Sequence, residues 1–347
     1  MRITVLAGGV GGARFLRGLK AAAPDAEITV VGNTGDDISL FGLHVSPDLD
    51  TVMYTLGGGI SEEQGWGRAD ETFTVLHELA AYGAGPGWFS LGDRDFATHI
   101  ARTGMLRAGL PLSAVTRALS ERWQPGVVLL PMTDDRVETH VTLAEGGNGE
   151  EGAQGAQSAA GADRADGGDG ADGAGADGAG RTVHFQEWWV RMHAAVPAAA
   201  ITFTGAESAA PAPGVLDAIA AADCVLLPPS NPVVSVGAIL AVPGIADAVR
   251  AKIVVGVSPI IGGAPVRGMA DACLAAIGVE TTAIAVAAHY GAGLLDGWLV
   301  DDQDKAAVDD PRLAGIAVRA LPLYMTNLAA SAEIARAALS LAAELAR

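Results

Sequence analysis

Four aspartates in one short stretch are the residues whose types and spacing most directly suggest chemistry. The segment NTGDDISLFGLHVSPDLDT, residues 33–51, carries them in two pairs around an apolar run: Asp36, Asp37, Asp48 and Asp50. A glycine beside the first pair and a proline beside the second predict that each pair lies in a short loop. Mg²⁺ takes oxygen ligands and keeps part of its water shell, so two converging carboxylate loops suit it. The stretch indicates a metal site, with the alternative that Asp36 or Asp48 only caps a helix.

A glycine-rich turn precedes these aspartates. An apolar, β-branched run stops at GGVGG, residues 8–12, and a helical pattern follows. Because strand, glycine turn and helix together present backbone N–H groups to a phosphate, Gly9, Gly11 and Gly12 are candidate phosphate contacts. The alternative is that the turn only permits close packing of strand and helix. Arg14 stands where the third glycine of a dinucleotide fingerprint would fall, and no P-loop Lys-Ser/Thr pair follows.

Two further strand ends carry polar residues. The apolar residues 27–32 form a second predicted strand that ends at Asn33, and residues 223–229 form another that ends at Ser230 and Asn231. In open α/β sheets ligands bind at the carboxyl ends of the strands. We therefore expect these side chains to face one crevice with the glycine turn, with Ser230 and Asn231 as a second anion cradle.

A tryptophan in an irregular segment is a further candidate for binding. Trp66 lies between glycines in GWG, where the sequence offers no core for it to join. A planar ligand stacked on the ring would account for it, although half-buried tryptophans are common. Asp93 and Arg94 precede a predicted helix, residues 96–108, whose inner stripe we predict to include Ile100.

Composition limits the class of protein. The chain has 347 residues, 50% of them hydrophobic and 18% charged, as expected for an enzyme with many buried strands. A formal net charge of −18 disfavours nucleic acid as a partner. Cys224 and Cys273 lie in apolar surroundings without metal-ligand spacing, which indicates reduced thiols in a cytoplasmic protein. The sequence begins without a signal-peptide pattern, and no apolar run is long enough to predict a membrane span.

Residues 144–180 differ from the rest of the chain. They consist almost wholly of Gly, Ala, Asp, Glu, Gln and Ser, with eight acidic residues against one arginine, a net charge of −7. Such a segment cannot bury enough apolar surface to offset its ordering entropy. We predict a disordered low-complexity insertion within a β-hairpin.

Strand and helix patterns alternate through the remaining sequence. This rhythm predicts an α/β fold: a doubly wound, largely parallel, Rossmann-like sheet in a single domain, residues 1–347. A smaller inserted lobe is expected between residues 57 and 196. Local patterns also predict a strand over 182–191, a strand and loop over 280–291, and Asp70 as the N-cap of the helix that follows it.

Several blocks of sequence together form a recognisable pattern. In order, they are LAGGVGGARFLRGL, NTGDD, SPDLDTVMYTLGGG, WFSLGDRDFATHIARTGMLRAGLPLS, LLPMTD, PPSNPVVSVGAIL and SPIIGG. Together they resemble the family of 2-phospho-L-lactate transferases, which build the side chain of the deazaflavin coenzyme F420. The resemblance covers nearly the whole chain except residues 144–180, the acidic tract. QGWGRADET and FQEWWVR look most like the actinobacterial members, which are implied to transfer phosphoenolpyruvate instead of phospholactate.

The resemblance implies a reaction. The donor would be enolpyruvyl- or lactyl-diphospho-guanosine, and the acceptor the deazaflavin alcohol FO. The terminal ribityl hydroxyl of FO would attack the phosphorus that bears the enolpyruvyl or lactyl group, and GMP would leave. Mg²⁺ as cofactor and a homodimer are also implied.

The four aspartates can be given roles in such a reaction. Asp36 and Asp48 are the expected Mg²⁺ ligands, with Asp37 and Asp50 as supporting groups, and one of the four serves as general base. Gly9, Gly11, Gly12, Asn33, Ser230 and Asn231 are then the candidate donor-binding residues. Trp66, Asp93 and Arg94 are the candidate wall for the acceptor's flat ring.

Two other functions remain open from the sequence. A related group with similar glycine and NTGDD motifs is implied to bind nucleotide-sugars without catalysis and to regulate cell-wall metabolism. Retention of the GWG and SPDLDT blocks favours the transferase over that group. A nicotinamide dehydrogenase is disfavoured by Arg14 and by the lack of an acidic residue closing the second strand.

Overall fold

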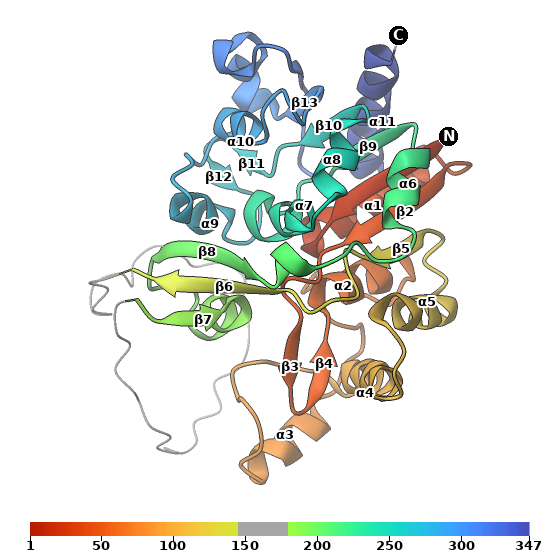
Figure 1. Ribbon diagram of the computed structural model, residues 1–347, viewed down its shortest axis with the longest axis vertical. Helices are drawn as coiled ribbons and strands as arrows, with labels where there is room; N and C mark the ends of the chain where they lie inside the picture. Colours follow the sequence, from red (N-terminus) through yellow and green to blue (C-terminus); the bar gives the residue numbers. More distant parts are fainter. Residues whose placement is uncertain (145–179, 347) are drawn as a thin grey trace.

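A parallel sheet forms the centre of the computed structural model, which describes residues 1–144 and 180–346 (Figure 1). Its seven strands have the order β14-β13-β10-β9-β1-β2-β5, and every neighbouring pair is parallel. They are β1 (Arg2–Ala7), β2 (Glu27–Gly32), β5 (Val128–Pro131), β9 (Cys224–Leu227), β10 (Val254–Val257), β13 (Gly297–Val300) and β14 (Ala317–Ala320). The α/β, largely parallel fold expected from the sequence is confirmed.

Helices cover both faces of this sheet because its strands are apolar on both sides. Val5 of β1 belongs to one hydrophobic core and the next residue, Leu6, to the other. The core with Val5 packs beneath α1 (Gly9–Ala22), α2 (Pro47–Leu56), α5 (Leu112–Trp123) and α11 (Leu328–Leu345). The core with Leu6 packs beneath α6 (Val215–Ala221), α7 (Ala238–Ala241), α8 (Ile245–Arg250), α9 (Ala270–Ala276) and α10 (Ala283–Tyr290).

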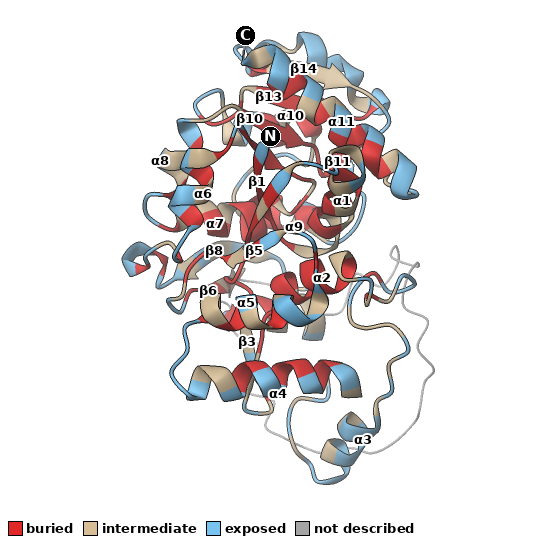
Figure 2. Ribbon diagram, turned by 90° about the vertical axis from the view of Figure 1, so that its right-hand side faces the viewer, coloured by how far each residue is buried: buried red, intermediate tan, exposed pale blue. Residues whose placement is uncertain are grey.

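Smaller elements extend from the carboxyl ends of the strands. A hairpin of β3 (Ile38–Leu40) and β4 (Leu43–Val45) shares a third, small core with α3 (Thr74–Ala81) and α4 (Asp93–Arg107). An antiparallel sheet contains β7 (Thr182–His184), β6 (Glu138–Leu143) and β8 (Ala198–Thr204), and β11 (Ile260–Ile261) pairs with β12 (Ala264–Pro265). Short helical turns span Glu187–Arg191, Ala206–Ser208, Pro232–Gly237, Asp302–Asp309 and Pro311–Leu313. Buried residues concentrate in the central layers, whereas α3 has none (Figure 2).

The segment 57–196, where a smaller lobe is expected, contributes both to the smaller elements and to the central sheet. It contains α3 and α4 but also β5, an edge strand of the central sheet. Residues 145–179, which make up nearly all of the predicted disordered tract, lie outside the described residues. The described residues on either side of 145–179 meet in the β6–β7 hairpin, where the N–H of Gly180 donates to the carbonyl of Leu143 over 3.2 Å.

Several local predictions were wrong. The strand predicted over 182–191 ends at His184, and the following helical turn buries Trp188, whose indole N–H donates to the carbonyl of Val196 over 2.8 Å. Within residues 280–291, predicted as a strand and loop, Ala283–Tyr290 form helix α10. Their run of Ala, Ile and Val is apolar on every side and therefore shows no helical period.

Two side-chain predictions also failed. Ile100 of α4 is 57% exposed, whereas Phe96 and His99 lie on the inner face. Asp70 has a positive φ of 53° and caps no helix, because Asp93 supplies the cap of α3.

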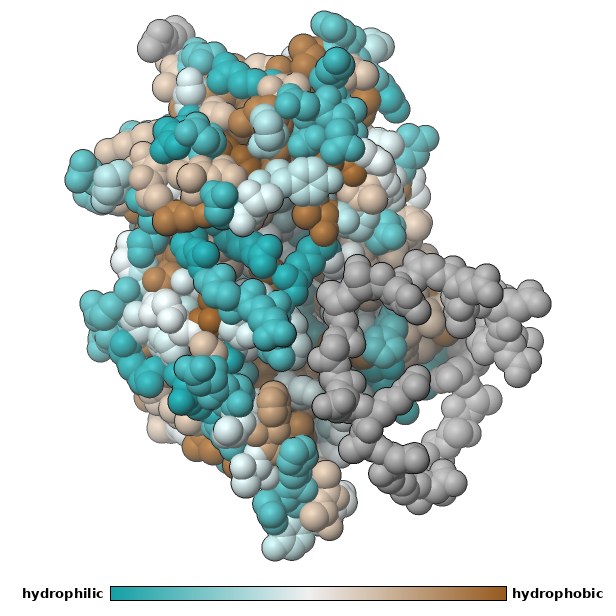
Figure 3. Space-filling view, turned by 180° about the vertical axis from the view of Figure 1, so that it is seen from behind, coloured by the Kyte–Doolittle hydropathy of each residue, from teal (hydrophilic) through white to brown (hydrophobic). Residues whose placement is uncertain are grey.

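Hydrophilic side chains cover much of the face in Figure 3, and hydrophobic ones form scattered patches. Within residues 1–144 and 180–346, no helix has both the length and the apolar character needed to cross a membrane.

Candidate active site

The strand order reverses between β1 and β9, which is where a doubly wound sheet opens its ligand crevice. The glycine turn at the end of β1 meets residues 228–231 at the end of β9. Ser230 Oγ accepts the N–H of Gly8 over 3.1 Å and donates to the Gly8 carbonyl over 2.7 Å. A Cβ on Gly11 would lie 2.2 Å from the carbonyl oxygen of Pro229, so only glycine permits this approach.

Three predicted donor-binding residues therefore have structural roles at the crevice. Ser230 holds the glycine turn in place, and Gly11 allows the loops to touch. Asn231 caps the helical turn Pro232–Gly237, since its Oδ1 accepts N–H groups from Val233 over 2.9 Å and Val234 over 3.2 Å. The close packing that the sequence left open as the alternative to a phosphate contact is therefore present at this glycine turn.

Asp48 lies next to the glycine turn. It belongs to the first turn of α2, not to a loop as predicted, because Pro47 suits the first helical position. Asn33, fully buried at the end of β2, donates from Nδ2 to Asp48 Oδ2 over 2.9 Å and accepts the N–H of Gly35 over 2.8 Å. A Cβ on Gly8 would lie 2.3 Å from Asp48 Oδ2. Burial raises the pKa of Asp48 to about 6, against the lowering effect of its hydrogen bonds.

Asp36 carries the least compensated charge of this group. Its side chain is 5% exposed, and its Oδ1 has no hydrogen-bond partner in the part of the chain that the structure describes. Burial raises the pKa of Asp36 well above its usual range, and the negative charge of Asp48 raises it further. The two carboxylates are thus close enough to repel each other, and a shared cation would relieve that repulsion.

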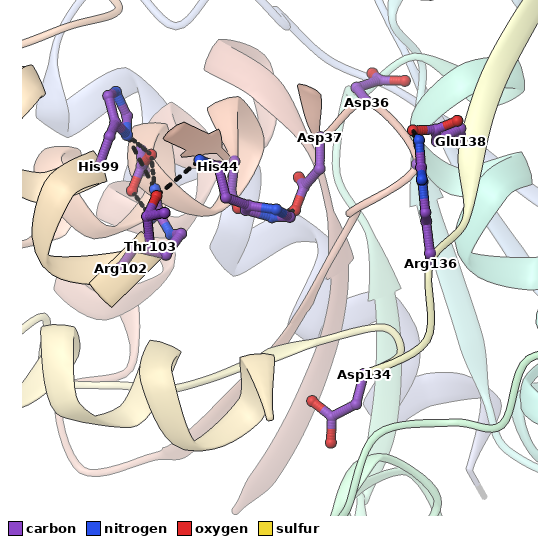
Figure 4. A network of polar contacts seen from close by, with 12 residues as sticks. Asp36, Asp37, His44, His99, Arg102, Thr103, Asp134, Arg136 and Glu138 are labelled. Carbon is purple, nitrogen blue, oxygen red and sulfur yellow. Dashed lines mark hydrogen bonds and ion pairs between the residues drawn. The ribbon is translucent and has the colours of Figure 1, made fainter. Parts of the chain in front are cut away.

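Asp37 turns toward a different partner. Its Oδ2 accepts from His44 Nε2 over 2.8 Å and from Ser46 Oγ over 2.7 Å, and the backbone N–H of His44 donates to Thr103 Oγ1 of α4 over 2.8 Å (Figure 4). Burial raises the pKa of Asp37, and the hydrogen bond from His44 opposes this. One oxygen, Oδ1, is buried without a partner among the described residues. Asp37 thus holds the β3–β4 hairpin while keeping one oxygen free.

Asp50 is engaged in a buried ion pair. Arg102 Nη1 of α4 donates to Asp50 Oδ2 over 3.0 Å, and Arg102 Nη2 donates to Oδ1. His99 Nδ1 lies 3.1 Å from the same Nη1. Positions 48 and 50 point about 200° apart around a helix, so Asp50 faces α4 and not the partner of Asp48. Sequence reasoning missed Arg102; its signal was a polar residue three positions after His99 on the buried stripe of a helix.

The predicted acceptor residues lie on and beside the loop 61–75. Trp66 is 45% exposed, so no core accounts for its position. Asp93 caps α3 through the N–H groups of Thr74 at 3.2 Å and Val75 at 2.9 Å. Arg94 donates from Nη1 to the carbonyl of Ala69 over 3.0 Å and is otherwise exposed. Asp93 and Arg94 therefore order the segment next to Trp66.

Mg²⁺ can be tested against these side chains. Among the described residues, no group of three or more His, Cys, Asp or Glu side chains is arranged to hold a metal. Mg²⁺ bound together with substrate phosphates needs only one or two carboxylates, because water and phosphate complete the octahedron. Asp36, with a buried unpartnered oxygen, and the neighbouring Asp48 fit that requirement.

Comparison with known proteins gives the family. Residues 3–317 match the model of the family described as 2-phospho-L-lactate transferase CofD. The chain belongs to this family. It is 63% identical over 347 residues to a phosphoenolpyruvate transferase of Streptomyces coelicolor, with 99% of each chain covered. It is 62% identical to the protein of that name in Thermobifida fusca and 52% identical to that in Mycobacterium sp. (strain KMS), in both cases with 99% of each chain covered.

Solved structures support the fold alone. Protein BH3568 from Bacillus halodurans superposes with a TM-score of 0.59 at 18% identity, covering 97% of this chain and 99% of that one. A second structure of that protein, described as a member of the UPF0052 family, has a TM-score of 0.58 at 17% identity. The resemblance to the transferase family seen in the sequence blocks is confirmed by the family model and by the similar relatives.

Proposed function

We propose that this chain is a cytoplasmic phosphoenolpyruvate transferase of coenzyme F420 biosynthesis. It transfers the phosphoenolpyruvyl group from enolpyruvyl-diphospho-guanosine to the terminal ribityl hydroxyl of FO, giving dehydro coenzyme F420-0 and GMP. The preference for an enolpyruvyl over a lactyl donor rests on the relatives named phosphoenolpyruvate transferase. The single observation that carries the site is the buried pair Asp36 and Asp48 beside the glycine turn at the strand-order reversal.

The chemistry of this transfer asks mainly for positioning and neutralisation of charge. Asp36 and Asp48 would hold Mg²⁺, which when bound would offset the negative charge of the donor's phosphates. Asp37 is our candidate general base, because Oδ1 is unpartnered while Oδ2 is fixed by His44 and Ser46. Asn33 orients Asp48 through its 2.9 Å hydrogen bond.

Mass spectrometry of the products tests the proposal. Purified protein is incubated with FO, Mg²⁺ and either the enolpyruvyl or the lactyl donor. The expected result is dehydro coenzyme F420-0 with equimolar GMP from the enolpyruvyl donor, formed faster than coenzyme F420-0 is formed from the lactyl donor. Faster turnover of the lactyl donor would reverse the donor assignment. Binding of the nucleotide without any product would favour the non-catalytic regulator instead.

Trp66 is proposed to stack on the deazaflavin ring, because its indole is 45% exposed in a loop fixed at both ends. Trp66→Ala should weaken FO binding by about tenfold or more, as loss of an aromatic stacking contact does. Quenching of deazaflavin fluorescence measures this, with GDP affinity as the control. If FO and GDP weaken equally, or neither weakens, Trp66 does not hold the acceptor.

The family resemblance also implies assembly, and we propose a homodimer. Light scattering coupled to gel filtration measures its mass directly. A monomer at micromolar concentration would refute this part of the proposal.

A further inference from the structure

Two arginines near the glycine turn lack an acidic partner. Arg14, half-buried on α1, forms no hydrogen bond or ion pair within residues 1–144 and 180–346. Arg267, just after β12, donates from Nη2 to the carbonyl of Gln64, and no carboxylate in the same described part pairs with it. Unpaired guanidinium groups are unexpected in a chain with 40 acidic residues and only 22 Lys and Arg.

The loop 61–67 contacts both Arg267 and the helix that carries Arg14. Arg17 of α1 forms an ion pair with Glu62, which fixes the loop over that face of the helix. Arg14 lies three residues before Arg17, so it points to the same face, one turn closer to the glycine turn. Arg267 also contacts the loop, since its Nη1 lies 2.7 Å from where a Cβ on Gly65 would be.

The charges of the two arginines oppose each other. The pKa of Arg267 is lowered, first by desolvation against the loop and then by the positive charge of Arg14. A like-charged pair costs free energy in the empty protein, and an anion placed between the two groups reverses that cost. Guanidinium groups suit this role because their forked N–H donors match phosphate oxygens.

We propose that Arg14 and Arg267 together bind the diphosphate of the nucleotide-linked donor. This inference rests on the proposed function, because it names residues for the same donor. Arg14 projects from the helix that begins in the glycine turn, so the diphosphate would lie at the crevice between β1 and β9. Arginine contacts would then hold the loop 61–67, which carries Trp66, beside the bound donor.

Calorimetric titration with GDP tests the proposal. Arg14→Gln and Arg267→Gln keep a polar side chain that can donate hydrogen bonds but remove the charge. We expect each to weaken GDP binding by about ten- to a hundredfold, as loss of a charge-assisted hydrogen bond does. Arg250→Gln is the matched control, since Arg250 lies on α8 and pairs with Asp247 over 2.7 Å. Unchanged GDP affinity in both test variants would overturn the proposal.

Thermal unfolding separates a binding role from a structural one. Without ligand, Arg14→Gln should melt at or above the wild-type temperature, because a repulsion is removed. The rise in melting temperature caused by GDP should be smaller than in wild type. Arg14→Lys and Arg267→Lys should recover part of the GDP affinity. A lower melting temperature without ligand, together with no recovery by lysine, would assign a structural role instead. If wild type itself fails to bind GDP, the donor assignment of the proposed function fails first.

Discussion

Asp48 and Asp50 lie two positions apart and face different partners. Asp48 contacts Asn33 and the glycine turn, whereas Asp50 is fixed by Arg102. Asp36→Asn or Asp48→Asn should reduce turnover by about a hundredfold or more, because the variant would bind less well the Mg²⁺ that offsets the charge of the donor's phosphates. Turnover measured against Mg²⁺ concentration should show a requirement for more Mg²⁺ in both variants. If their metal dependence matched the wild type, neither aspartate would be a ligand.

Asp50→Ala serves as the contrast to those variants. It leaves the buried guanidinium of Arg102 uncompensated, which costs about 3–5 kcal/mol of unfolding free energy. Urea denaturation should detect this loss, while the Mg²⁺ dependence of the remaining activity should resemble wild type. A stable Asp50→Ala protein with altered metal dependence would move Asp50 into the metal site.

Asp95, in the first turn of α4, carries a buried carboxyl group. Its side chain is 7% exposed and its Oδ1 has no partner among the described residues. Burial first, then the charges of Asp50 and Glu71, raise its pKa to about 7 from the usual 3.8. A raised pKa means that Asp95 contributes stability below the unfolded-state pKa, and that this contribution is lost as the pH rises through about 7.

Asp95→Asn should make that loss visible. The variant cannot ionise, so its melting temperature should exceed the wild-type value at pH 8 by more than at pH 5. Scanning calorimetry of both proteins at the two pH values measures this difference in melting temperature, and the value at pH 5 serves as the control. Equal differences at both pH values would show that Asp95 does not ionise in this range.

At the scale of one element, the N-terminus of helix α3 is capped by a single side chain, that of Asp93. None of its eight residues is buried, and its N-terminal N–H groups of Thr74 and Val75 are held by Asp93. The hydrogen bonds from Thr72 and these N–H groups lower the pKa of Asp93, so its stabilising effect is present at neutral pH and is lost as the solution becomes acidic.

Asp93→Ala should therefore loosen α3 without unfolding the sheet. Amide hydrogen exchange over Thr74–Ala81 should become faster, while exchange in β1 stays unchanged. Asp93→Ser should retain part of the protection, because a serine hydroxyl also caps helices. Unchanged exchange in the alanine variant would show that other contacts hold α3.

For the whole molecule, the acidic tract is predicted to be dispensable for folding. Its ends are adjacent, since the N–H of Leu143 donates to the carbonyl of Arg181 over 2.9 Å and Gly180 donates back to Leu143. Deleting residues 145–179 joins Ala144 to Gly180 in a tight hairpin turn. Melting temperature and turnover should both remain close to wild type. A large fall in turnover with an unchanged melting temperature would reveal a functional role for the tract.

The sequence by itself determined the family and the strands that local apolar runs mark. Apolar runs ending at glycine or asparagine predicted β1, β2 and β9, and the ordered blocks predicted the transferase family. These features could be predicted because they depend on neighbouring residues. The strand β13 and the helix α10 were missed, since short apolar runs do not distinguish strand from buried helix.

Only the tertiary structure decided which polar residues are already engaged. Asp50 and Arg102 are 52 positions apart, and Ser230 and Gly8 are 222 apart, yet each pair is in contact. Loop 61–67 likewise contacts both Arg17 of α1 and Arg267. The pairing of a buried charge depends on whatever the fold places beside it, and desolvation makes that choice energetically large. Residue type and spacing therefore predicted four aspartates at one site, while the fold left Asp36 and Asp48 as a buried pair of like charges.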